Sequence, residues 1–370
     1  MAPFSFFRQP SKRLEPASSV LFISSGGLGD TVLLAQIFKR FRAVAGSQEK
    51  ISLLLRKDAA KMSFLFSNDI DIEAVDYDRF QKSGKYRNET CKRLYERNFR
   101  CVVSLDYLRH PKLDEVLAKA CSASETIAME PRTWVKYDKL LLQNREIYDR
   151  LYDSGPVHLD KVVRWSRFAD WLTVRKEPLH KLGLPGNSKP EPVNLPRPTI
   201  VFVPFSAVKE KQSLPELFVS IIDMVLEGNG GFDFVVVGAP GDLAKNPSFQ
   251  SVLKLANVYF DDSSFEDLAP VLCAADLVVA VDTATMHLAA ALGTPTLCLA
   301  SAAYINEIVP YAPEISPDNV HFIFENMECA GCLGDCHLPP ENGMYPCVAR
   351  LDLSMVLAKV KGLLNKSERR

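Results

Sequence analysis

The feature that most constrains the fold is a repeated alternation of short apolar segments with stretches of helical periodicity. In the first half, apolar segments at 20–24, 51–55 and 101–105 are each followed by polar or helical sequence. Short segments that are apolar throughout indicate strands buried on both faces. Strands of this kind, separated by helices, predict a parallel sheet with right-handed crossovers.

The second half repeats the alternation after a proline-rich interruption. Its strand-like segments are TIVFVP, FDFVVVGAP, LVVAV and TPTLCLA, and its predicted helices lie near 214–227, 265–274 and 284–292. Residues 183–198 hold five prolines in sixteen positions, which indicates a linker. We therefore predict two α/β domains with a cleft where the carboxyl ends of their sheets meet.

The predicted domain boundaries follow this pattern. They are an N-terminal tail at 1–17, a first Rossmann-like domain at 18–182, the linker at 183–198, a second Rossmann-like domain at 199–350 and a closing amphipathic helix in 351–370. A chain of 370 residues has a suitable length for two domains.

Composition excludes several classes of protein. The formal net charge of −1 gives no global field that would favour nucleic acid. The most apolar stretch, 268–303, is interrupted by Asp276, Asp282 and His287, so it is no membrane span. The N-terminal apolar run is too short for a signal peptide. We expect a cytoplasmic protein with reduced cysteines, free or at the inner face of the inner membrane, with at most peripheral membrane contact.

A glycine-rich turn follows the first predicted strand, within SSGGLGDTVLLAQ at 24–36. Turns of this kind often hold a phosphate on free backbone N–H groups. Here Asp30 ends the turn, and Val32 stands where the third glycine of a dinucleotide fingerprint belongs. Two interpretations stay open: Asp30 caps the helix, or it has a functional role.

A second motif, VVAVDTATMHLAAALGTPT, spans 278–296. A buried strand leads into Asp282 and Thr283, after which a short helix begins. These side chains and the free N–H groups of a helix start suit sugar hydroxyls and a diphosphate. His287 lies one turn inside the helix, where a lone histidine is more often packed than functional.

Four of the nine cysteines fall within nineteen residues in the spacing C-x2-C-x3-C-x10-C. They are Cys329, Cys332, Cys336 and Cys347. The spacing predicts a tetrahedral site of four thiolates, which suits zinc or iron and is structural because no coordination position is open. Buried free thiols or a disulfide pair are the alternatives. The other five, expected to fill the core, are Cys91, Cys101, Cys121, Cys273 and Cys298.

A basic stretch occupies residues 79–112, with ten Lys and Arg against three acids. It could receive a phosphorylated glycolipid core or an acidic protein surface, or it could be a solvated helix face. The near-zero net charge of the chain as a whole argues against nucleic acid.

The two motifs together resemble glycosyltransferase family nine, the bacterial heptosyltransferases. The matching positions are Gly29–Asp30 and the block at 282–295, which is similar to Asp-Thr-Gly-x-x-His-Leu-Ala-Ala-Ala-Leu-Gly-x-Pro. The resemblance implies the GT-B fold, with the acceptor on the N-terminal domain and the nucleotide-sugar on the C-terminal one. It also implies transfer of heptose from ADP-heptose with inversion and without a donor-bound metal.

The resemblance assigns roles to individual residues. The chemistry of the first turn supplies others: an ionised Asp30 at a helix start is the expected catalytic base, and Gly27 and Gly29 keep the acceptor-side turn bare. The family's Lys-x-Trp-Pro appears here as VKEKQSLPE, which lacks the tryptophan; Lys211 is the chosen phosphate lysine, with Lys209 second. Ala284 replaces the glycine of Asp-Thr-Gly. The expected donor-binding residues are Ser206, Lys211, Asp282, Thr283, Ala284 and His287.

The cysteines are similar to those of one branch of the family, the protein heptosyltransferases that modify autotransporter adhesins, some of which hold iron in four thiolates. We therefore predict an inverting glycosyltransferase that moves heptose to a lipopolysaccharide-core, glycan or protein hydroxyl. Two other interpretations are an NAD(P)-dependent oxidoreductase and a GT-B-like binding protein without catalysis.

Overall fold

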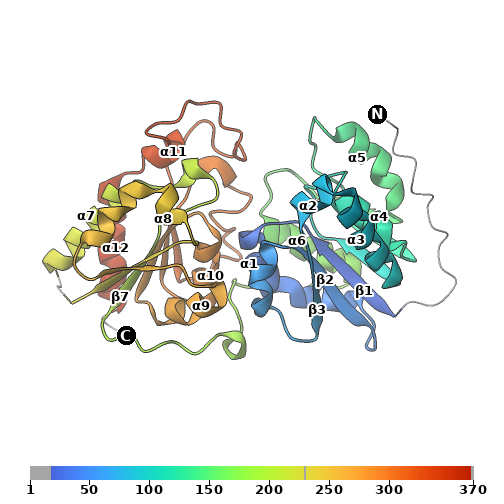
Figure 1. Cartoon of the computed structure of the whole chain (residues 1–370), viewed down its shortest axis with the longest axis horizontal. Coiled ribbons are helices and arrows are strands. Elements are labelled where there is room, and N and C mark those ends of the chain that lie inside the picture. Colours follow the sequence, from blue (N-terminus) through green and yellow to red (C-terminus); the bar gives the residue numbers. More distant parts are fainter. Residues whose placement is uncertain (1–17, 229–230, 368–370) are drawn as a thin grey trace. The chain divides into compact units, whose positions relative to one another are not determined.

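The computed structural model describes residues 18–228 and 231–367, and the chain divides into two compact units (Figure 1). Unit 1 extends to Val157 and adds Arg164–Pro178, whereas unit 2 comprises His158–Val163 and the chain from Leu179 onward. The predicted tail at 1–17 lies outside the described residues. Within the described part of the chain, no helix combines the length and apolar composition needed to cross a membrane.

The proline-rich segment at 183–198, predicted as a linker, lies within unit 2. Leu184 donates its backbone N–H to Ala291 O at 2.8 Å, and Val193 donates to Pro270 O at 3.3 Å. The Leu184 side chain is buried. Prolines lack a backbone donor, so this extended segment attaches through its non-proline residues.

Unit 1 contains a parallel sheet of six strands, which Figure 1 shows with its helices around it. The strands are β1 (Ser19–Ser24), β2 (Lys50–Arg56), β3 (Ile70–Val75), β4 (Cys101–Ser104), β5 (Glu125–Met129) and β6 (Arg150–Tyr152). The helices are α1 (Leu28–Ile37), α2 (Tyr77–Lys82), α3 (Gly84–Glu96), α4 (Asp114–Cys121), α5 (Asp138–Asn144) and, from Arg164 onward, α6 (Lys161–Thr173).

Unit 2 contains a second parallel sheet of six strands. They are β7 (Thr199–Val203), β8 (Asp233–Val237), β9 (Val258–Asp261), β10 (Leu277–Val281), β11 (Thr296–Leu299) and β12 (Val320–Ile323). The helices are α7 (Pro215–Gly228), α8 (Asp242–Lys245), α9 (Phe265–Ala274), α10 (Ala284–Leu292), α11 (Pro346–Ala349) and α12 (Leu353–Ser367).

The two sheets have the same strand order. It is β3-β2-β1-β4-β5-β6 in unit 1 and β9-β8-β7-β10-β11-β12 in unit 2, which is the doubly wound Rossmann order. The order reverses between β1 and β4 and again between β7 and β10. In sheets of this kind ligands bind beyond the carboxyl ends of the strands at that reversal. The topology therefore directs attention to the segments after these four strands.

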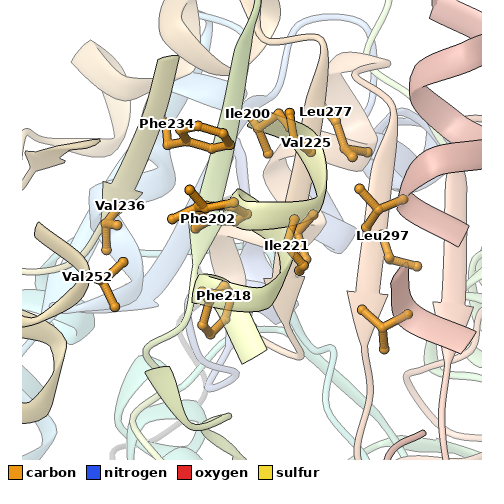
Figure 2. Close-up of a cluster of buried hydrophobic side chains, with 14 of the residues drawn as sticks. Ile200, Phe202, Phe218, Ile221, Val225, Phe234, Val236, Val252, Leu277 and Leu297 are labelled. Carbon is orange, nitrogen blue, oxygen red and sulfur yellow. The ribbon is translucent and has the colours of Figure 1, made fainter. Parts of the chain in front are cut away.

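The core of unit 2 forms where α7 packs on its sheet, as Figure 2 shows. Phe218 and Ile221 of α7 are fully buried against Phe202 of β7 and Phe234 of β8. The rings of Phe202 and Phe234 stack at 5.7 Å. Burying a side chain of this size contributes about 1.5–3 kcal/mol, so this layer rigidly supports the strand ends that carry the site.

A buried acid in unit 1 makes stability depend on pH. Asp114, at the start of α4, accepts hydrogen bonds from Tyr77 Oη at 2.9 Å and His110 N at 2.6 Å. Burial nevertheless raises the pKa of Asp114 from 3.8 to about 6. A raised carboxyl pKa means that its contribution is most favourable below the unfolded pKa and is lost as pH rises through the folded one.

We expect Asp114→Asn to remove this dependence, because the amide does not titrate. The free energy of unfolding of the variant, relative to that of the parent, should rise by up to about 3 kcal/mol between pH 4 and pH 6.5. Guanidinium unfolding at pH 4, 5, 6 and 7.5 measures the difference. A difference that is the same at every pH would contradict this account of Asp114.

Candidate functional site

The glycine-rich turn of unit 1 connects β1 to α1 and is closed by Asp30. Gly27 is the N-cap of α1, and Asp30 is the third helical residue. Its Oδ2 accepts a hydrogen bond from the backbone N–H of Gly27 at 2.8 Å. This is the carboxylate half of a capping box, and a negative charge is favourable at a helix start. This hydrogen bond therefore supports the capping interpretation of Asp30.

A close backbone approach explains one glycine of this turn. A Cβ on Gly26 would lie 2.5 Å from Asp30 Cβ, so only glycine fits where the Asp30 side chain folds back. A Cβ on Gly27 would meet nothing within 4 Å. The sequence argument chose Gly27 and Gly29 and missed Gly26. The available signal for Gly26 was Asp30, an acid four positions later whose side chain folds back onto the turn.

A second carboxylate lies beside this turn and was also missed. Asp106 lies two residues after the end of β4, is 4% exposed, and accepts hydrogen bonds from Ser25 N at 2.7 Å and Ser25 Oγ at 3.3 Å. It therefore joins the ends of β1 and β4 at the point where the strand order reverses. The available signal was an acid immediately after an apolar strand, the same pattern that identified Asp282.

Most cations of the stretch 79–112 are held in ion pairs, which weakens its interpretation as an acceptor surface. Arg93 pairs with Glu73 at 2.7 Å, and Arg100 pairs with Glu49 at 2.5 Å. Arg109 is 1% exposed and pairs with Glu115 at 3.2 Å. These ion pairs lie within unit 1 and stabilise it. The spacing of the cations in the sequence does not reveal them, because their acids come from other segments of the chain.

In unit 2, Lys211 and Asp282 meet at the strand reversal. Lys211 ends a short helical turn, η6 (Lys209–Lys211), in the segment after β7, and Asp282 follows β10. Lys211 Nζ lies 2.5 Å from Asp282 Oδ2, and the two side chains are 11% and 6% exposed. The ring of Tyr304 lies under the ammonium at 4.9 Å. This ion pair joins two predicted donor-binding residues from distant parts of the sequence.

The start of α10 supplies the remaining polar groups of this edge. Thr283 is the N-cap with an extended backbone and makes no side-chain cap hydrogen bond. Ala284 is the first helical residue, and the first N–H groups of any helix lack an intrahelical acceptor. The positive end of the helix dipole and the Lys211 ammonium both favour an anion at this edge.

His287 is placed as a packed residue. It is 3% exposed, and its Nδ1 lies 2.6 Å from Tyr311 Oη. Burial raises the pKa of Tyr311 well above its ordinary value, so this phenol stays neutral. The contact fixes the imidazole beneath the α10 start, which favours support of the helix over direct contact with a ligand.

Ser206 and Lys209, the two other predicted donor-side residues after β7, have different hydrogen-bond partners. Ser206 Oγ accepts a hydrogen bond from Val208 N at 3.3 Å, which shapes the loop that leads to Lys211. Lys209 donates to Gln212 Oε1 at 3.1 Å and also contacts Asn246. Lys209 is therefore committed within the loop, whereas Lys211 is directed toward Asp282.

The cysteine segment packs against the lysine loop. Tyr345 donates its backbone N–H to Glu210 O at 2.8 Å, and its hydroxyl donates to Gly334 O at 3.3 Å. Gly334 has φ +86°, and a Cβ there would lie 2.9 Å from the Tyr304 hydroxyl. The close approach and the positive φ both require glycine. The cysteine segment thus contacts Glu210, which precedes Lys211, and Tyr304, whose ring lies under the Lys211 ammonium.

The four cysteine side chains share one neighbourhood. Burial raises the pKa of the Cys347 thiol, and charges at Cys329, Cys332 and Cys336 would raise it further. Cys347 Sγ accepts a hydrogen bond from Ala302 N at 3.4 Å. As the side chains stand, no three His, Cys, Asp or Glu residues in 18–228 and 231–367 form a metal-holding group. Burial also raises the pKa of Cys121 and Cys298, as expected for core cysteines.

Comparison with known proteins identifies related families and folds. Residues 157–332 match the model of glycosyltransferase family 9 (heptosyltransferase). A search of the curated proteins finds no match. The fold is similar to a family 9 glycosyltransferase from Veillonella parvula, with a TM-score of 0.67 at 17% identity, covering 94% of this chain and 97% of that one.

Two Escherichia coli enzymes have the same fold. Heptosyltransferase WaaC, solved with ADP, matches with a TM-score of 0.65 at 15% identity over 95% of this chain and 100% of its own. ADP-heptose lps heptosyltransferase II matches with a TM-score of 0.62 at 14% identity over 95% and 99%.

Two six-stranded parallel sheets in the Rossmann order, with this likeness over nearly the whole chain, define the GT-B class. The family match over 157–332 adds a narrower likeness, to glycosyltransferase family 9 (heptosyltransferase). The chain therefore has the GT-B fold and resembles family 9 over residues 157–332.

Proposed function

We propose that the chain is an inverting heptosyltransferase that uses ADP-heptose and transfers the sugar to a hydroxyl of a phosphorylated glycolipid, another glycan or a protein. The observation that carries the proposal is the Lys211–Asp282 pair at the strand reversal of unit 2, beside the start of α10. Support for the donor comes from the similar E. coli proteins, one solved with ADP and one named for ADP-heptose.

The donor side of the proposed mechanism uses unit 2. The Lys211 ammonium and the N–H groups at the start of α10 would bind the diphosphate and stabilise the charge that develops on it as the glycosidic bond breaks. Asp282 would hold the ammonium in place, and Thr283 would bind a sugar or phosphate oxygen through its unused hydroxyl. These groups supply the charge stabilisation of the leaving group, so the proposal needs no donor-bound metal.

The acceptor side of the proposed mechanism uses Asp30. As the acceptor oxygen attacks the anomeric carbon, Asp30 would take the proton of that hydroxyl. Its hydrogen bond to Gly27 N holds the side chain at the start of α1. The same arrangement counts against an NAD(P)-dependent oxidoreductase, because Asp30 and Asp106 place two carboxylates where a dinucleotide phosphate would be expected.

Nucleotide selectivity tests this proposal. We expect thermal shift and calorimetric titration to show that ADP and ADP-heptose bind, whereas NADH and UDP- or GDP-sugars bind at least tenfold more weakly. Tight binding of NADH would support the oxidoreductase. Binding of ADP-heptose without hydrolysis or transfer to any acceptor would support a GT-B-like binding protein.

We further propose that the four cysteines hold one structural zinc or iron ion. Cys347 is fixed by the Ala302 N–H, and hydrogen bonds to sulfur are a usual support of thiolate ligands. Bound metal would stabilise the small apolar cluster formed by Ala302, Met344, Cys347 and Val348. Its role is structural, because four thiolates leave no coordination position open.

Elemental analysis of protein purified without chelator should give about one equivalent of zinc or iron per chain. Cys332→Ser should lose this metal and lower the thermal stability of unit 2. Cys273→Ser in α9 is the matched control, because it removes a thiol from another part of unit 2, and it should retain the metal. A metal-free parent protein of full stability would contradict the proposal.

A further inference from the structure

Five large apolar side chains are exposed together on two neighbouring segments of unit 1. They are Leu108 (42% exposed), Trp134 (36%), Val135 (94%), Leu140 (37%) and Leu142 (68%), and we call them the apolar rim. Single exposed apolar residues are ordinary, but a contiguous group usually marks an interaction surface. The proposed transferase chemistry uses none of these side chains.

Hydrogen bonds join the two segments into one surface. Arg132 donates its backbone N–H to Tyr107 O at 2.6 Å, and Asn144 Nδ2 lies 3.4 Å from Pro111 O. The His110 imidazole lies 3.1 Å from the Tyr137 hydroxyl. The loop after β4 is therefore fastened to the segment that carries α5, which Figure 1 labels.

An aromatic group lies within this surface. The rings of Trp134 and Tyr137 meet edge to face at 4.6 Å, and His110 lies 5.9 Å from Trp134. These contacts hold the half-exposed indole in place. Tryptophan and tyrosine are the side chains enriched at the boundary between lipid headgroups and acyl chains.

The charge around the apolar rim is positive. Lys112, Arg132, Lys136 and Lys139 have no ion pair with another described residue, and Lys136 lies over the Tyr137 ring at 5.2 Å. Arg145 and Glu130 pair with each other at 2.6 Å and cancel. The remaining acids are Asp138 and Glu146, so four cations against two acids leave a net charge of +2. Exposed apolar side chains that share their segments with unpaired cations fit an anionic lipid surface.

The place of this surface in the sheet adds a functional reason. Its segments follow the carboxyl ends of β4 and β5, the same edge of the sheet that carries the Asp30 turn after β1. We propose that the apolar rim docks unit 1 on an anionic lipid bilayer. Docking at this edge would present the turn to an acceptor anchored in that bilayer. The binding itself requires neither donor nor acceptor, so the proposal stands apart from the transferase function.

The intrinsic fluorescence of Trp134 provides the test. The chain has three tryptophans; Trp165 is 1% exposed, and Trp171 is covered by Arg150 at 4.4 Å and stacked on Phe168. With vesicles of phosphatidylglycerol and phosphatidylethanolamine, we expect sedimentation of the protein and a blue shift of its emission. Bromine-labelled acyl chains should quench that emission. Trp134→Phe should lose the blue shift and the quenching while it still sediments.

Variants separate the apolar and charged contributions. Val135→Ser with Leu142→Ser should reduce vesicle binding at least tenfold, because two highly exposed side chains no longer insert. Lys136→Gln with Lys139→Gln should lower binding about fivefold for each lysine and reduce its salt dependence. The matched control is Tyr259→Ser with Met355→Ser, two exposed apolar side chains of unit 2, which should bind like the parent.

Three results would overturn the proposal. The first is failure of the parent protein to bind anionic vesicles at low salt. The second is unchanged binding by the Val135→Ser, Leu142→Ser variant. The third is a parent dimer in light scattering that this variant converts to a monomer, without vesicle binding, because the rim would then be a self-association surface. Retained ADP affinity in every variant shows that the proposed donor site is unaffected.

Discussion

Asp30→Asn should lower turnover by about 10²–10⁴-fold while the fold and the affinity for ADP-heptose stay unchanged. The amide cannot accept the proton of an attacking hydroxyl. It can still accept the hydrogen bond from Gly27 N, because Asn and Asp cap helices with similar strength. The substitution therefore separates the observed capping role of Asp30 from its proposed catalytic role. Single-turnover kinetics with saturating donor measure the chemical step directly.

A capping acid elsewhere in unit 1 provides the matched control. Asp76 caps α2 and accepts a hydrogen bond from Arg79 N at 3.0 Å. Asp76→Asn should leave turnover and thermal stability near those of the parent. Near-parental turnover in Asp30→Asn would show that Asp30 only caps α1, and another base would then have to be sought, with Asp106 as the next carboxylate at the same edge.

Lys211→Ala should weaken ADP and ADP-heptose binding by about one to two decades. A charge-assisted hydrogen bond of this kind contributes roughly 1.5–3 kcal/mol, and 1.4 kcal/mol corresponds to a tenfold change in affinity. Isothermal titration measures the change. The structure adds a complication, because removing the ammonium leaves the Asp282 carboxylate buried without its partner at 2.5 Å. An uncompensated buried charge lowers stability by itself.

A double-mutant cycle resolves this complication. Asp282→Asn removes the unpaired charge, so the Lys211→Ala, Asp282→Asn variant should be more stable than Lys211→Ala alone, yet it should still bind ADP weakly. Lys209→Ala is the matched control, since its ammonium is engaged by Gln212 and Asn246. Full ADP affinity in Lys211→Ala with a loss in Lys209→Ala would transfer the role to Lys209.

Much of the fold could be predicted because its central elements are buried on both faces. The α9 and α10 helices and the β10 strand have the predicted bounds, since caps or turn residues delimit an apolar run in each case. Edge strands were harder to find. The β3 strand includes the acids Asp71 and Glu73, and β6 has only three residues, so neither is a continuous apolar run.

The donor side of the site was more predictable than its supporting contacts. Asp282 was identified because it directly follows a buried strand, and Lys211 because its segment resembles the family's Lys-x-Trp-Pro. The topology brings the two together. Tyr304 gave no comparable signal, since it reaches the ammonium from the segment after β11. The pairing of Arg93 and Arg100 was likewise hidden, because their acids come from other elements. Contacts between distant segments depend on the fold and cannot be read from local spacing.

The anomeric configuration of the product tests the central proposal most directly. With ADP-β-heptose and a phosphorylated glycolipid acceptor, proton NMR should show acceptor-dependent release of ADP and a new α-linked heptose, because a single displacement assisted by one base inverts the anomeric carbon. A β-linked product would contradict the inverting mechanism and the role of Asp30. Release of ADP that is independent of any glycan or protein acceptor would contradict the assignment as a transferase.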